Sequence, residues 1–187
     1  MKYQIIYSDP PWPFKTYSEK GKGRSPEKHY KCMSMDDIKK LPVGNIADDN
    51  CALFLWPVFP HLEHALEVIK AWGFTYKTVA FVWVKTNRKT MGFHWGCGYW
   101  TRANAEIVLL ATKGKPKRLS AGVHQVIMEP VGKHSVKPRI VRKKIVKLMG
   151  NLSRIELFAR EKEEGWVSIG LDIDGKDIRD VLGGGKT

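Results

Sequence analysis

The sequence predicts an α/β fold of the doubly wound kind, in which a mostly parallel sheet carries helices on both faces. Short β-branched and aromatic segments alternate with segments whose apolar residues recur at helical spacing, a pattern typical of parallel strands joined by helices. The chain has 187 residues, 43% of them hydrophobic, which is enough for one continuous core. Since no repeat, low-complexity segment or linker interrupts it, residues 1–187 are expected to form a single domain.

The first predicted strand covers Tyr3–Tyr7, whose residues are mainly β-branched and aromatic. It must stop at Ser8-Asp9-Pro10-Pro11, because two prolines forbid both further strand pairing and a helix. Asp9 is therefore expected at the carboxyl end of this strand. In doubly wound folds, ligands bind beyond the carboxyl ends of the strands.

Helix caps and apolar spacing place the remaining elements. Gly73 and Gly150 supply helix stops, and Pro138 suits the first turn of a helix. Two long segments without a clear period, 15–31 and 88–104, are predicted to be functional surface loops. The expected helices run from the N-cap Ser34 to Leu41, from Leu62 to Trp72 and from Pro138 to Met149, and the expected strands cover residues 51–56, 79–84, 106–111, 123–128, 155–158 and 166–169.

Charge and cysteine content limit the partners and the compartment. The 32 Lys and Arg residues exceed the 19 Asp and Glu residues, giving a net charge of +13, which favours a polyanion such as nucleic acid as partner. Three widely spaced cysteines suggest no disulfide framework, and no apolar run approaches the ~20 residues of a membrane span. A soluble cytoplasmic protein is therefore expected, and the sequence leaves monomer and homodimer open.

The segment Asp9-Pro10-Pro11-Trp12 has the features of a site that methylates an exocyclic amine. Such an amine is a poor nucleophile, and the Asp9 carboxylate and the Pro10 carbonyl could each accept one of its protons in a hydrogen bond. The paired prolines would keep these acceptors aimed, and Trp12 offers a flat face for a base swung out of its stack. A rigid turn with a buried tryptophan is the simpler alternative.

Several segments, in order along the chain, closely resemble the family of adenine methyltransferases that includes the catalytic subunit of the messenger-RNA methyltransferase, the MT-A70 family. The resemblance covers nearly the whole chain and is nearest to compact bacterial and phage members thought to act on DNA. It rests on Ser8–Trp12, on residues 29–41, 53–56, 82–87 and 98–106, on Lys137-Pro138 and on Ile155-Glu-Leu-Phe158.

The resemblance implies a Rossmann-like methyltransferase sheet in the permuted, beta-class order, with the catalytic motif before the cofactor-binding half. It also implies S-adenosylmethionine as cofactor and transfer to the N6 amine of adenine. The segments 13–30 and 132–137 match mobile gates. The catalytic residues would be Asp9, Pro10, Pro11 and Trp12; the cofactor-binding residues Ser8, Asp9, Ser135, Lys137, Phe158, Arg160 and Asp172; and the substrate-binding residues Lys15, Tyr30, Trp56, Lys85, Trp95, Trp100, Arg102 and Glu106.

One departure from the eukaryotic members concerns the ribose end of the cofactor site. After Arg160 those members carry His-Asn, whereas this chain has Glu161-Lys162-Glu163. Asp172 could accept a hydrogen bond from a ribose hydroxyl, and a solvated surface aspartate is an equal alternative.

Basic side chains are expected to hold phosphates. The loop 94–102 mixes aromatics with a cation, as base-stacking sites do, although a loop packed by its own tryptophans is the alternative. The expected phosphate contacts are Lys20, Lys22, Arg24, Lys113, Lys115, Lys117 and Arg118.

A metal site is not expected. His61 and His64 lie near each other in sequence, but no paired Cys-x-x-Cys accompanies them, so solvated helix histidines are the prediction.

Three functions other than adenine methylation of DNA remain open from the sequence. They are the same reaction on RNA, transfer to the cytosine amine, and a catalytically silent nucleic-acid-binding partner of another methyltransferase. DNA is favoured because the chain is compact and adds no RNA-binding module.

Overall fold

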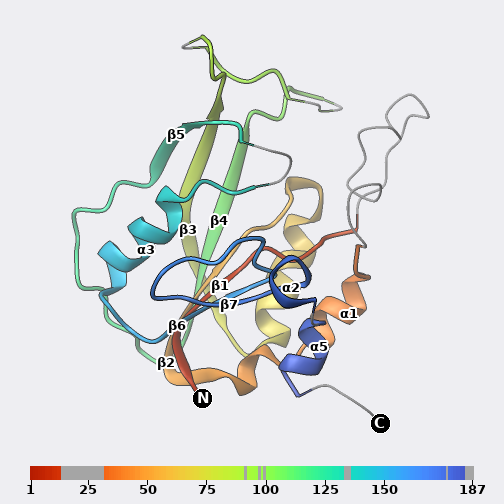
Figure 1. The fold of residues 1–187 in the computed structure, drawn as a ribbon, viewed down its shortest axis with the longest axis vertical. Coiled ribbons are helices and arrows are strands. Elements are labelled where there is room, and N and C mark those ends of the chain that lie inside the picture. The colour runs from red at the N-terminus through yellow and green to blue at the C-terminus, as the bar shows by residue number, and fades with distance from the viewer. Residues whose placement is uncertain are drawn as a thin grey trace.

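A computed structural model of the protein describes residues 1–13, 32–90, 92–96, 98, 100–132, 136–175 and 177–183. Its centre is one seven-stranded sheet with the strand order β5-β3-β4-β2-β1-β6-β7 (Figure 1). The strands are β1 (Tyr3–Ser8), β2 (Ala47–Leu55), β3 (Thr75–Thr86), β4 (Ala105–Lys113), β5 (Val126–Pro130), β6 (Arg154–Leu157) and β7 (Val167–Ile169).

Helices cover both faces of the sheet, which confirms the doubly wound prediction. On one face, Ile38, Val68 and Ile178 join Ile6 and Leu53 in one core cluster. On the other face, Val141 and Ile145 pack with Tyr7 and Phe54 in a second cluster. The helices are α1 (Met35–Lys40), α2 (Leu62–Ala71), α3 (Ile140–Met149), α4 (Leu171–Asp174) and α5 (Ile178–Val181), with 3-10 turns η3 (Val43–Asn45) and η4 (Phe59–His61).

The predicted boundaries hold closely for α1. The Ser34 side chain accepts a hydrogen bond from the Asp37 backbone N–H at 3.1 Å and so caps the helix. Asp36 and Asp37 stand in its first turn, where carboxylates interact favourably with the helix dipole.

The direction of one strand was not foreseen. Six strands run parallel, but β4 pairs antiparallel with both β2 and β3. β3 and β4 follow each other in sequence, and the segment 87–104 between them contains no crossover helix in its described part. A parallel connection needs such a crossover, so the chain must turn back on itself here.

β3 is twelve residues long, well beyond its predicted limits, and together with β4 it forms an arm that rises above the rest of the sheet (Figure 1). The described residues of the segment 87–104 lie at the tip of this arm (Figure 1). None of the helices in the described part of the chain is long and apolar enough to span a lipid bilayer.

Candidate active site

The strand directions bring the candidate residues to one edge of the sheet. The carboxyl ends of the six parallel strands share this edge with the amino end of β4, so Asp9, Lys85, Glu106 and Phe158 all lie along it. The chain leaves β1 toward β2 and returns to its other side as β6. Ligands of doubly wound folds bind at such a reversal point, here between Asp9 and Phe158.

Backbone hydrogen bonds fix the segment that follows β1. The Trp12 N–H donates to the Pro10 carbonyl at 2.8 Å, and the Met33 N–H donates to the Pro11 carbonyl at 2.9 Å. His61 Nε2 lies 2.7 Å from the Pro13 carbonyl oxygen. The Pro10 carbonyl thus keeps one lone pair for a second donor.

Three residues of the predicted site, Ser8, Trp12 and Trp56, have buried side chains in this arrangement. Trp12 is 4% exposed and donates its indole N–H to the Trp56 carbonyl at 2.7 Å, so it anchors the turn in the core and offers no open face to a base. Ser8 and Trp56 are completely buried. The Trp56 indole N–H donates to the Tyr7 hydroxyl at 2.6 Å instead.

Four charged side chains form a continuous network at this edge. Lys137 Nζ lies 3.2 Å from Asp9 Oδ2 and 2.9 Å from Glu106 Oε2, and Lys85 Nζ lies 2.6 Å from Glu106 Oε1. Each lysine also lies over an indole, Lys137 at 5.1 Å from the centre of the Trp56 ring and Lys85 at 5.2 Å from that of Trp83. The Trp56 ring therefore stabilises the ammonium group of Lys137 through a cation–π contact.

The network sets the protonation of its members unequally. Burial raises the pKa of the Asp9 carboxyl and Glu106 adds to this effect, whereas Lys137 and Arg160 oppose it. Burial alone would also raise the pKa of Glu106, but Lys137 and Lys85 outweigh it and lower this pKa to about 2. Of the two carboxylates, Asp9 is thus the one whose buried negative charge is less fully offset by neighbouring cations.

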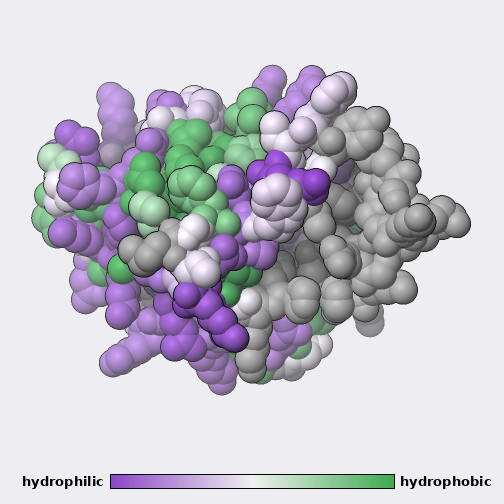
Figure 2. Space-filling model, turned by 90° about the horizontal axis from the view of Figure 1, so that it is seen from above, coloured by the Kyte–Doolittle hydropathy of each residue, from purple (hydrophilic) through white to green (hydrophobic). Residues whose placement is uncertain are grey.

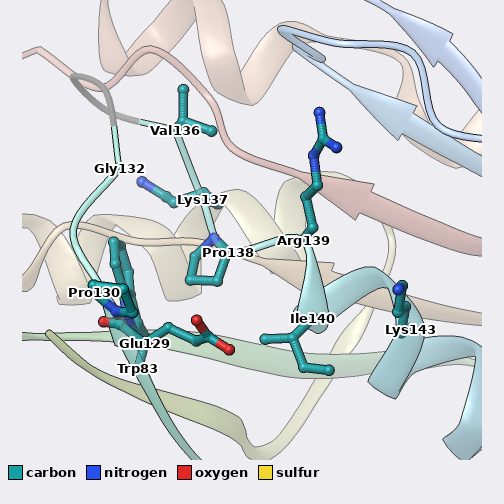
Figure 3. A pocket seen from close by; sticks show the side chains of 10 residues that line it. All are labelled: Trp83, Glu129, Pro130, Gly132, Val136, Lys137, Pro138, Arg139, Ile140 and Lys143. Carbon is teal, nitrogen blue, oxygen red and sulfur yellow. Dashed lines mark hydrogen bonds between the residues drawn. The ribbon is translucent and has the colours of Figure 1, made fainter. Parts of the chain in front are cut away.

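A cavity of about 370 Å³ opens beside Lys137, between the ends of β3 and β5 and the start of α3. Trp83, Glu129 and Pro130 line one side, and Ile140 and Lys143 of α3 line the other (Figure 3). Open space thus adjoins the charged network at Lys137.

Close backbone packing brings the predicted ribose-binding residues together. The Ala159 N–H donates to the Ile169 carbonyl at 2.8 Å, and a Cβ added at Gly170 would collide with the Ala159 backbone. This contact places the start of α4, with the exposed Asp172, beside the turn Phe158–Arg160. Phe158 has φ +61°, a strained value that non-glycine residues keep mainly at functional sites.

A buried ion pair that was not predicted lies behind Asp9. Arg142 of α3 donates to Glu156 of β6 through Nε at 2.6 Å and Nη2 at 2.8 Å, and through Nη1 to Glu161 at 3.1 Å. Arg139 also binds Glu161. A glutamate inside the apolar run Ile155-Glu-Leu-Phe158 was the available sequence signal, because a buried carboxylate needs a partner. Glu161 therefore fastens the turn after Arg160 to α3.

The tip of the arm carries exposed aromatic side chains. The Arg102 guanidinium lies 4.9 Å from the centre of the Trp95 ring, and Trp95 and Trp100 are 76% and 91% exposed. Seen from above, this end of the molecule shows a hydrophobic patch bordered by hydrophilic side chains (Figure 2).

Some predicted contacts fall elsewhere. Lys15, Tyr30 and Ser135 lie outside the described residues, as do Lys20, Lys22 and Arg24. The reversed direction of β4 places Lys113 at the amino-end edge of the sheet, and Lys115, Lys117 and Arg118 follow it there. These four residues therefore lie away from Asp9, and the expectation that they hold phosphates stays a prediction.

The helix histidines are not solvated as predicted. His61 and His64 are half-buried, with their rings edge to face at 5.5 Å. Among the described residues, no three His, Cys, Asp or Glu side chains converge as a metal site would require.

Comparison with known proteins matches this chain to methyltransferases. Residues 3–172 match the family model described as MT-A70. The chain is 34% identical to a type II methyltransferase, M.MunI, of Mycoplasma sp over 95% of this chain and 80% of that protein. It is 29% identical to an N(6)-adenosine-methyltransferase MT-A70-like protein of Arabidopsis thaliana over 92% of this chain, but spans only 24% of that relative's length.

Proposed function

Because this chain belongs to the MT-A70 family, we propose that it transfers a methyl group from S-adenosylmethionine to the exocyclic N6 amine of adenine in DNA. The observation that carries the proposal is Asp9, an incompletely compensated carboxylate held on a rigid turn at the reversal point of the sheet. The similarity to a bacterial type II methyltransferase over most of both chains favours DNA as the substrate.

The residues at the edge suit this cofactor. S-adenosylmethionine, when bound, supplies an electrophilic methyl group on a positively charged sulfur. Burial has raised the pKa of Asp9, so a cationic group placed beside its carboxylate relieves an existing electrostatic cost. The strained Phe158 and the adjacent Arg160 and Asp172 would border the ribose, and Lys137 would face the methionine end.

The protein's own contribution to the reaction is positioning. Asp9 accepts one proton of the adenine amine in a hydrogen bond, and the free lone pair of the Pro10 carbonyl accepts the other. These acceptors favour a tetrahedral nitrogen whose lone pair points at the methyl group. Lys137, which also binds Glu106, holds the Asp9 carboxylate in place, which is the preorganisation that electrostatic stabilisation requires.

The test compares wild type with Asp9→Ala. Cells expressing each are examined by sequencing that detects methyladenine in DNA, and the purified proteins are given labelled S-adenosylmethionine with DNA or RNA oligonucleotides. Methylated adenine in DNA with wild type only supports the proposal. Incorporation only into RNA would overturn DNA as the substrate, and methylcytosine in digested nucleosides would overturn adenine as the target base. No incorporation into either would overturn the enzyme proposal and favour a catalytically silent nucleic-acid-binding partner.

A further inference from the structure

We propose that the Trp95–Arg102 pair at the tip of the β3–β4 arm fills the gap left in duplex DNA when the target adenine rotates out of the helix. The inference rests on the proposed function, and it names double-stranded DNA as the substrate on which the arm acts. An adenine inside a duplex cannot reach Asp9 without leaving its stack, which requires breaking stacking and pairing contacts.

The tip is built to present this pair. A Cβ added at Gly96 would collide with the Ala103 carbonyl, and one added at Gly98 would collide with that of Thr101. Only glycine allows the two sides of the tip to approach so closely, and this approach brings Arg102 onto the Trp95 ring. Trp95 nevertheless remains 76% exposed, so a large flat surface is held ready in water.

Backbone and side-chain contacts connect the tip to the catalytic edge. The His94 N–H, next to Trp95, donates to the Lys85 carbonyl at 2.9 Å. The Lys85 side chain binds Glu106, which in turn binds Lys137 beside Asp9. A side chain that enters the duplex at the tip thus lies on the same edge as the carboxylate that receives the extruded base.

The charge of the tip indicates which partner fits. Residues 87–105 contain Arg88, Lys89 and Arg102 and no Asp or Glu. All three cations are exposed. A purely positive loop around an exposed indole suits phosphates that flank a stacked base, because base–aromatic stacking tolerates any sequence and the cations neutralise the backbone.

The first experiment needs no methylation. Fluorescence anisotropy compares binding of an intact duplex with binding of the same duplex carrying one abasic site, which is a ready-made gap. Wild type and Trp95→Phe are expected to prefer the abasic duplex, whereas Trp95→Ala loses a preference of about 10-fold, within the range for stacking of one base. Tyr76→Ala removes a half-exposed aromatic from the other end of β3 and serves as the matched control.

The second experiment measures methylation of the target sequence as a paired duplex, as a duplex with the target adenine opposite an abasic site, and as a single strand. Trp95→Ala is expected to lower kcat/KM about 10- to 100-fold on the paired duplex and less than about 3-fold on the other two substrates, since in those two the adenine leaves its place without breaking a base pair and less of the rate depends on a filled gap. Equal losses on all three substrates, or a change in the oligomeric state of Trp95→Ala that accounts for the loss, would overturn the inference. If wild type methylates nothing yet shows the Trp95-dependent preference for the abasic duplex, the proposed function fails and the gap-filling role stands.

Discussion

At the scale of single residues, the Asp9–Lys137–Glu106 contacts make the protonation of Asp9 adjustable from two sides. The Asp9 carboxylate must be ionised to accept a hydrogen bond from the amine, and burial has raised its pKa. Activity should therefore fall on the acid side at a pH above the ~3.9 of an ordinary aspartate. Lys137 lowers this pKa and Glu106 raises it.

The acid limb of the pH profile is the range over which activity falls as the pH is lowered. Two substitutions should move it in opposite directions. Removing the cation in Lys137→Met raises the pKa of Asp9 further and shifts the limb to higher pH. Glu106→Gln removes a neighbouring negative charge and shifts the limb to lower pH. Single-turnover methylation rates with saturating cofactor, measured across pH, give the midpoint of the acid limb for each variant. Circular dichroism verifies that both variants fold. Shifts of the same sign in the two variants would contradict the charge network around Asp9.

At the scale of elements, α3 and β6 are joined by the buried pair Arg142–Glu156. Burial raises the pKa of Glu156 even though Arg142 binds it through two nitrogens. Truncating one partner leaves the other charge buried, so Arg142→Met should lower the free energy of unfolding by about 3 to 5 kcal/mol. The double variant Arg142→Met/Glu156→Leu should recover most of this loss, since no buried charge remains.

Urea unfolding followed by tryptophan fluorescence measures these differences. Arg139→Met is the matched control, because Arg139 also binds Glu161 but its side chain is 69% exposed, where an ion pair contributes about 1 kcal/mol or less. An Arg142→Met variant no less stable than Arg139→Met would show that the buried pair does not hold these elements together.

These elements also show how far the sequence could predict the site. Local signals placed β1, the Ser34 cap and Asp9, because proline, cap and apolar patterns act over a few residues. The direction of β4 depends on how the chain returns after residue 86, which no local pattern specifies. Trp12 was predicted to face a base, but burying its large ring in the core while its N–H binds the Trp56 carbonyl is more favourable. Arg142 stands in an amphipathic helix, where a basic residue ordinarily faces water, so its partner emerged only from the fold.

At the scale of the whole molecule, the net charge of +13 includes exposed lysines near both ends of the sheet. Lys89 lies on the arm beside the catalytic edge, whereas Lys117 lies near the opposite edge, beyond the end of β4. Both are exposed lysines. If duplex DNA binds along the catalytic edge, only the first contacts phosphate, and the second acts at most through its long-range field.

The salt dependence of binding separates these two roles. Each phosphate contact that is lost lowers the slope of log Kd against log salt concentration by about 0.9. Lys89→Gln should therefore reduce the slope by about that amount, whereas Lys117→Gln, with the same change in charge, should leave it unchanged. Fluorescence anisotropy with one duplex across a salt series gives both slopes. Equal reductions for the two variants would mean that DNA contacts both ends of the sheet, and would move the bound strand away from the single edge on which Asp9, Lys137 and the arm meet.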